Sequence, residues 1–176
     1  MAGQRLTDKT ALDEQAGSGD LLMVVDVNDT TGSAEGTSKK MDFKYVIQTD
    51  KFSLTNAEVV ALNSTPKTLV GALSGYMVTP ISCTVLTTYA ASTESSNNNL
   101  YFGFDPSQDV VYWQYATRFN GSITGDNTYI FSGDQPGRGV HTASTLNTAL
   151  SMWSNAAFNG GWACDVYCTY AYTKVL

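Results

Sequence analysis

The chain after residue 52 is built from short runs in which apolar and polar residues alternate, separated by turn-forming segments. The runs are MVTPISCTVLTTYA, LYFGF, VVYWQYATRF, TYIFSG and ACDVYCTYAYTKV. In the last run Cys164, Val166 and Cys168 fall on every second residue, as in a strand that buries one face. The connectors ASTESSNNN, DPSQD, NGSITGDN and SGDQPGRG are rich in residues that favour turns. This pattern predicts an antiparallel β-sandwich or jelly roll.

Two earlier apolar runs flank a loop of small and polar residues. Residues 21–27 (LLMVVDV) and residues 41–47 (MDFKYVI) are separated by a Gly- and Ser-containing stretch that ends in two lysines. Such a loop between two apolar arms predicts a β-hairpin. The chain is therefore expected to be mainly β, with an N-terminal hairpin followed by the sandwich.

Two segments fit either a helix or a strand. SLTNAEVVAL contains a capping box formed by Thr55 and Glu58, yet its adjacent valines and its length also suit a strand. ASTLNTALSMWSNAAF has apolar residues at helical spacing, but its Ser, Thr and Asn content disfavours a helix. We interpret both segments as strands.

Composition divides the chain near Lys51. Of 26 charged residues, 15 lie in the first 51 positions, whereas 18 of the 20 aromatic residues follow them. A charged segment with few aromatics buries little surface by itself and is expected to be ordered mainly by a partner. We therefore predict an N-terminal adaptor, residues 1–51, and a β domain, residues 52–176.

The charge balance excludes some partners. A net charge of -6 and only 10 Lys and Arg residues argue against binding a nucleic-acid backbone. No apolar stretch has the roughly 18–20 residues of a membrane-spanning helix, and residues 1–15 lack a secretory signal pattern. We therefore expect no membrane insertion. The three cysteines, Cys83, Cys164 and Cys168, lie in apolar runs and are expected to be reduced and buried.

Candidate reaction centres do not fit known chemistry. Asp26, Asn28 and Asp29 begin an acidic cluster, but the loop lacks the Gly and terminal acid of an EF-hand and has no second DTTG to form an aspartic dyad. A polar hairpin turn is the better interpretation. His141 is the only histidine, which excludes a metal site built on several histidines. We predict no catalytic residue, metal or cofactor, and thus no enzyme.

The aromatic residues Tyr101, Tyr112 and Trp113 leave an alternative open. Flat aromatic rings stack on sugars, so these three could form the platform of a lectin-like module that binds host surface glycans. Packing in the core or between subunits is the favoured interpretation, because aromatics are enriched in both.

Longer motifs carry a resemblance to a known family. LTDKTAL, followed by GDLLMVVDVNDTTGSAEGTSKKMDF, resembles the amino-terminal module of tailed-bacteriophage fibre and decoration proteins. ALNSTPKTLVGALSGYMVTPISCTV is similar to the start of the β domain of such proteins. Together these stretches cover about half of the chain.

The resemblance implies a virion component assembled in the host cytoplasm. Such a head-fibre, capsid-decoration or tail-fibre subunit is usually a homotrimer, docks on other capsid or tail proteins through its amino-terminal segment and displays its β domain. It implies that the docking residues are Leu6, Leu21, Leu22, Val24, Val25, Val27, Lys39 and Lys40.

Overall fold

The chain consists of two compact units. The computed structural model describes residues 20–42, 45–90, 92–96, 98–106, 110–115, 125–132 and 145–175. Its units are Met1–Val46 and Ile47–Leu176. The boundary lies before the compositional seam at Lys51, because β3 (Gln48–Leu54) already pairs with β10 (Trp162–Lys174). Lys51 is charged yet belongs to the second unit, where its Nζ lies 2.8 Å from a carboxylate oxygen of Asp165.

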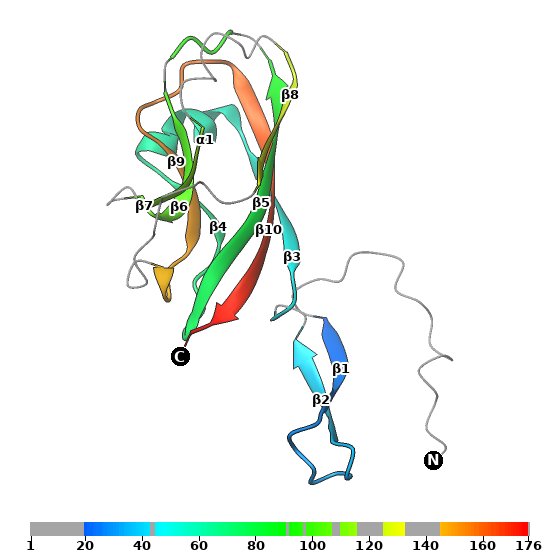
Figure 1. Ribbon diagram of the computed structural model, residues 1–176. Helices are drawn as coiled ribbons and strands as arrows, with labels where there is room; N and C mark the ends of the chain where they lie inside the picture. Colours follow the sequence, from blue (N-terminus) through cyan, green and yellow to red (C-terminus); the bar gives the residue numbers. More distant parts are fainter. Residues whose placement is uncertain are drawn as a thin grey trace. The chain divides into compact units, whose positions relative to one another are not determined.

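The first unit contains a β-hairpin of β1 (Leu21–Asp26) and β2 (Thr37–Asp42) (Figure 1). The predicted hairpin and its first arm are confirmed. The predicted second arm, residues 41–47, is misplaced. β2 runs from Thr37 to Asp42, residues 45–47 are not in a strand, and residues 43 and 44 lie outside the described residues. The strand sequence TSKKMD is mostly polar and pairs with β1 through backbone bonds, so an apolar pattern does not reveal it.

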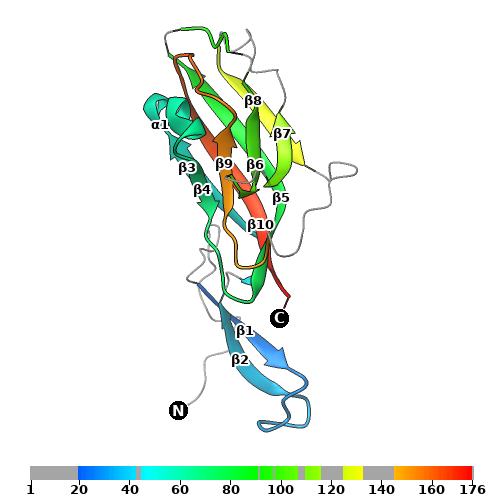
Figure 2. The same cartoon turned by 90° about the vertical axis from the view of Figure 1, so that its left-hand side faces the viewer.

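The second unit is a sandwich of two four-stranded antiparallel sheets (Figures 1 and 2). One sheet has the order β3-β10-β5-β8 and the other β4-β9-β6-β7. The remaining strands are β4 (Lys67–Val70), β5 (Tyr76–Tyr89), β6 (Leu100–Asp105), β7 (Val110–Tyr115), β8 (Asn127–Ser132) and β9 (Leu150–Ser154). Pairing the first strand of the sandwich with its last, and the second with the last but one, gives a jelly roll. The predicted fold class is confirmed.

A short helical segment carries the chain from one sheet to the other. α1 (Asn56–Val60) and the 3-10 turn η3 (Ala61–Asn63) connect the edge strands β3 and β4. The backbone N–H of Thr55 donates to Glu58 Oε2 at 2.8 Å, and the Glu58 N–H returns a bond to Thr55 Oγ1. The strand interpretation of this segment is wrong, because the capping box decides in favour of a helix.

The second ambiguous segment contains strand β9, as predicted. All five of its residues are buried. A strand covered on both faces shows no alternation of apolar and polar residues, which explains why its sequence also fitted a helix. The alternation in β10, by contrast, is observed: Cys164, Val166, Cys168 and Tyr170 are buried.

The core lies between the two sheets. The Phe102 ring from β6 and the Phe131 ring from β8, which belong to opposite sheets, have centroids 4.9 Å apart. Trp162, Leu100, Leu150 and Met152 are fully buried beside them. Burial of this kind stabilises the sandwich by roughly 1.5–3 kcal/mol for each large side chain. The second unit therefore has a hydrophobic core of its own.

Candidate functional site

The hairpin exposes a row of apolar side chains on one face. Leu21, Met23 and Val25 alternate along β1 and are 57%, 69% and 56% exposed, and Val27 follows them at 69%. Directly opposite on β2 are Asp42, Lys40 and Ser38. Alternate residues of a strand share a face, so the three β1 side chains form one continuous stripe. We call Leu21, Met23 and Val25 the apolar stripe.

The opposite face of the hairpin is partly covered. Leu22 and Val24 are half-buried, and their partners across the ladder are Met41 and Lys39. Since a two-stranded sheet has only these two faces, the predicted docking residues of β1 divide between them. Leu21 and Val25 are exposed, whereas Leu22 and Val24 lie on the half-buried side.

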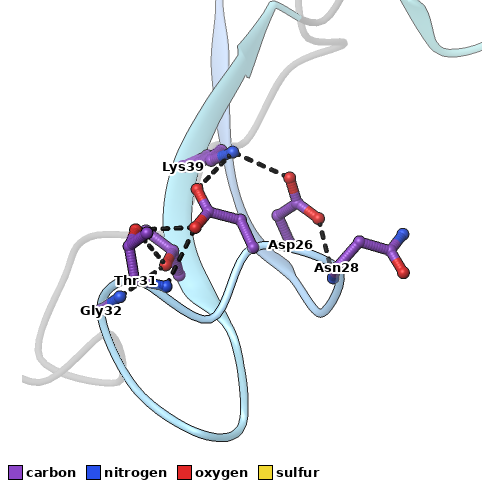
Figure 3. A network of polar contacts seen from close by, with 7 residues as sticks. Asp26, Asn28, Thr31, Gly32 and Lys39 are labelled. Atoms are coloured by element: carbon purple, nitrogen blue, oxygen red, sulfur yellow. Dashed lines mark hydrogen bonds and ion pairs between the residues drawn. The ribbon is translucent and has the colours of Figure 1, made fainter.

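Lys39 organises the tip of the hairpin (Figure 3). Its Nζ lies 2.9 Å from Asp26 Oδ2 and 2.8 Å from Asp29 Oδ2. The other oxygen of each carboxylate caps the backbone: Asp26 accepts the N–H of Asn28, and Asp29 accepts the N–H and the hydroxyl of Thr31. Both aspartates thus form the local side-chain turns that their residue type favours.

These contacts fix the charge of the cluster. Hydrogen bonds from Lys39, followed by those from Thr31, hold the pKa of Asp29 well below its usual range. The pKa of Asp26 is lowered by its bonds from Lys39 and Asn28, and the pKa of Lys39 is raised by the two carboxylates. The ionised lysine occupies the place between two ionised carboxylates. The arrangement is that of a closed polar turn, as the sequence indicated.

Two residues complete the tip. Thr37 Oγ1 accepts the backbone N–H of Gly32 at 2.9 Å. Gly36 has a φ of 124°, and a Cβ there would lie 2.8 Å from a Val25 methyl carbon, so this position requires glycine. Within the described ranges there is no group of three His, Cys, Asp or Glu residues that could hold a metal ion.

The three aromatic candidates do not form one exposed platform. Trp113 is only 2% exposed and contacts the rings of Phe102 and Tyr112 edge-on. Tyr112 is half-buried against the core. The Tyr101 ring packs on Trp153, with centroids 5.6 Å apart, and its hydroxyl accepts a bond from Asn99. A buried indole cannot stack on a sugar, so these positions fit the packing interpretation.

Sequence reasoning missed Met23 as a member of the stripe. The signal was present, because Met23 lies midway between Leu21 and Val25 in a strand with a period of two. It also treated Lys39 and Lys40 alike, whereas Lys39 is engaged in the tip and Lys40 lies beside the apolar stripe. Leu6 and His141 lie outside the described residues.

Known proteins resemble the chain only weakly. No model of a protein family and no curated protein matches the chain. Among solved structures, the cyanophage Pam1 capsid asymmetric unit is similar at 13% identity and a TM-score of 0.36, covering 97% of each chain. The Israel acute paralysis virus structure is similar at 9% identity and a TM-score of 0.29, covering 94% of each chain. Similarity at this level assigns no function.

The described part of the chain also lacks one kind of membrane element. No helix there has the length and apolar content needed to cross a lipid bilayer.

Proposed function

We propose that the protein is a non-enzymatic structural component of a bacteriophage virion, a head-fibre, capsid-decoration or tail-fibre subunit. Residues 1–46 fix it to another virion protein, and the jelly roll of residues 47–176 is displayed. The observation that carries this proposal is the apolar stripe, an exposed row of large aliphatic side chains on a unit separate from the sandwich.

The stripe argues for a partner on energetic grounds. An isolated two-stranded hairpin is at best marginally stable in water, and no third strand joins β1 and β2 within the described residues. The cost of exposing Leu21, Met23 and Val25 is removed when another protein covers them, at roughly 25 cal/mol for each Å² of apolar surface. Asp42 and Lys40, opposite Leu21 and Met23, flank the stripe with one charge of each sign, so the apolar side chains rather than net charge would supply most of the affinity.

The second unit supports display rather than attachment. Its core residues are buried between its own sheets, so this core needs no partner to form. Jelly rolls occur in viral capsid proteins and also in lectins, and fold alone does not decide function. The resemblance of residues 19–43 to the amino-terminal module of phage fibre and decoration proteins favours the virion role. A homotrimer assembled through the jelly roll is part of the same proposal.

The stripe can be removed without disturbing the sandwich. The variant Leu21→Ser, Met23→Ser, Val25→Ser replaces three exposed side chains and keeps the polar tip. It should lose association with particles of the phage that encodes it, measured as the fraction that sediments with particles lacking the native protein. We expect at least a tenfold loss of bound protein at subsaturating concentration, equivalent to about 1.4 kcal/mol.

Ile130→Ser is the matched control, because Ile130 is an aliphatic residue of the sandwich that is 70% exposed. This variant should sediment with particles as the wild type does. Equal binding by the stripe variant and the wild type would refute attachment through the hairpin. Loss of binding by Ile130→Ser alone would move the attachment surface to the jelly roll.

A further inference from the structure

Two of the three cysteines face each other inside the sandwich. Cys83 of β5 and Cys168 of β10 are direct partners in the antiparallel ladder between the two longest strands (Figure 1). The thiol of Cys83 donates to Cys168 Sγ, with the two sulfur atoms 3.2 Å apart. Both residues are fully buried and neither is bridged. The pair is thus brought together by the register of the fold across 85 positions of sequence.

The backbone at this pair already suits a disulfide. Directly opposed residues of an antiparallel pair have Cα atoms about 4.5–5.5 Å apart, within the range of about 4.4–6.8 Å that disulfides span. The sulfur atoms need to approach by only about 1 Å to reach the bond length of about 2.05 Å. We expect a change in side-chain torsion angles to close this gap.

Cys164 does not share this geometry. It lies on β10 between Thr87 of β5 and Leu54 of β3. Cys168 follows it by four residues on the same strand, a separation of about 13 Å. Cys164 is also buried. It is therefore an internal control, a buried thiol that has no second thiol opposite it on the neighbouring strands.

We propose that Cys83 and Cys168 form a cross-strand disulfide that stabilises the jelly roll when the protein meets a disulfide oxidant such as glutathione disulfide. The two thiols lose two protons and two electrons as the S–S bond forms. Glutathione disulfide takes up both and leaves as two molecules of glutathione. The reaction proceeds through a mixed disulfide on one cysteine, which the second cysteine displaces.

Burial determines when the bond can form. The hydrogen bond to Cys168 and the apolar surroundings raise the pKa of the Cys83 thiol, and the thiolate is the form that attacks a disulfide. Exchange in the closed sandwich is therefore slow. It is fast during folding or after opening of the sheet. A chain folded in a reducing cytoplasm keeps its thiols, and one that folds in an oxidising medium acquires the bond.

The experiment is to refold the full-length protein in a mixture of reduced and oxidised glutathione, and separately in excess reductant. Free thiols are then alkylated in denaturant, and the masses of the intact protein and its peptides are measured. We expect one alkylated cysteine, Cys164, and a peptide pair linked through Cys83 and Cys168 in the oxidised sample. The melting temperature of the oxidised protein should exceed that of the reduced protein by roughly 5–15 °C.

Variants separate the bond from general effects of oxidation. Cys164→Ser should show the same link and the same rise in melting temperature. Cys168→Ala should form no link and show no rise. Three alkylated cysteines in the oxidised wild type, a link through Cys164, a retained glutathione adduct or an unchanged melting temperature would each overturn the proposal. The wild-type measurement decides the matter even if a variant fails to fold.

Discussion

Glu94 Oε2 accepts a hydrogen bond from the indole Nε1 of Trp162 at 3.0 Å, and both side chains are fully buried. The same oxygen accepts the backbone N–H of Gly160 at 2.8 Å, and the other accepts the N–H of Ser96. One carboxylate in the segment before β6 thus ties that segment to the start of β10. Because it satisfies several donors at once, its burial is compatible with a stable sandwich.

Replacing Glu94 by Ala should destabilise the sandwich severely. The buried N–H groups of Gly160 and Trp162 would each lose their partner, at about 1–3 kcal/mol for each group. We expect the free energy of unfolding in urea to fall by roughly 2–6 kcal/mol. Ser95→Ala, in the same segment, is the control: it removes one exposed hydrogen bond, from Asn159, and should lower the free energy of unfolding much less. If the two substitutions had equal effects, the Glu94 carboxylate would not hold the two segments together.

Lowering the pH should weaken the hydrogen bonds that the Glu94 carboxylate accepts. Burial is the largest single influence on the pKa of Glu94 and raises it, but hydrogen bonds from Ser96, Trp162 and Gly160 together lower it from its ordinary value of 4.5. A carboxyl whose pKa is lowered in the folded state contributes stability that is present above its ordinary pKa of 4.5. This stability is lost as the pH falls through the folded value.

The urea concentration at which half of the protein is unfolded should therefore decrease when the pH is lowered below about 4. Other carboxylates with lowered pKa values, Asp165 and Glu58 among them, contribute to the same drop. The part due to Glu94 is the difference between the wild type and Glu94→Gln, whose side chain does not titrate. If both proteins lost stability equally between pH 6 and pH 3, Glu94 would have no role in the pH dependence.

Gly103 should not tolerate a side chain. A Cβ at this position, where the β6–β7 ladder shifts register, would collide with the backbone oxygen of Val110 and lie 2.8 Å from the Trp153 ring. We expect Gly103→Ala to lower the free energy of unfolding by about 1–3 kcal/mol. Gly71→Ala is the matched control, since a Cβ there meets nothing within 4 Å, and it should be nearly neutral. Similar losses for both would show that the close approach at Gly103 is unimportant.

The two lysines of β2 should differ in their effect on the hairpin. Lys39→Met leaves Asp26 and Asp29 without their cation, so their negative charges repel each other at the tip. The backbone amides of β1 and β2 should then exchange with solvent faster, as followed by NMR. Lys40→Met, on the opposite face, should leave exchange unchanged. Faster exchange in Lys40→Met than in Lys39→Met would contradict the assigned network.

Much of the sandwich could be predicted from the sequence because its strands bury one face. In β10 the buried residues fall on every second position, and this periodicity marks a strand directly. The same reasoning misplaced β2, whose Thr, Ser and Lys residues pair with β1 through backbone bonds that carry no side-chain signature. It misassigned α1, where the choice depended on the reciprocal bonds of Thr55 and Glu58 rather than on hydrophobic spacing.

The candidate sites were likewise predictable only where residues close in the sequence determine the structure. The acidic turn at Asp26 and Asp29 could be predicted, because Asp and Asn bond to the backbone within a few residues. The contact of Cys83 with Cys168 could not, since it depends on the register between β5 and β10. The burial of Trp113 in the core between the two sheets likewise depends on packing that no local pattern specifies.

The central claim is that residues 1–46 attach the protein to its particle and that residues 47–176 fold without them. The fragment 47–176 retains all eight strands of the jelly roll and its core. It should show the circular dichroism of a β protein and a cooperative thermal transition. The deciding measurement is the fraction of this folded fragment that sediments with particles lacking the native protein, relative to the full-length chain. The account predicts that the fragment stays in the supernatant, whereas sedimentation at full-length occupancy would contradict it.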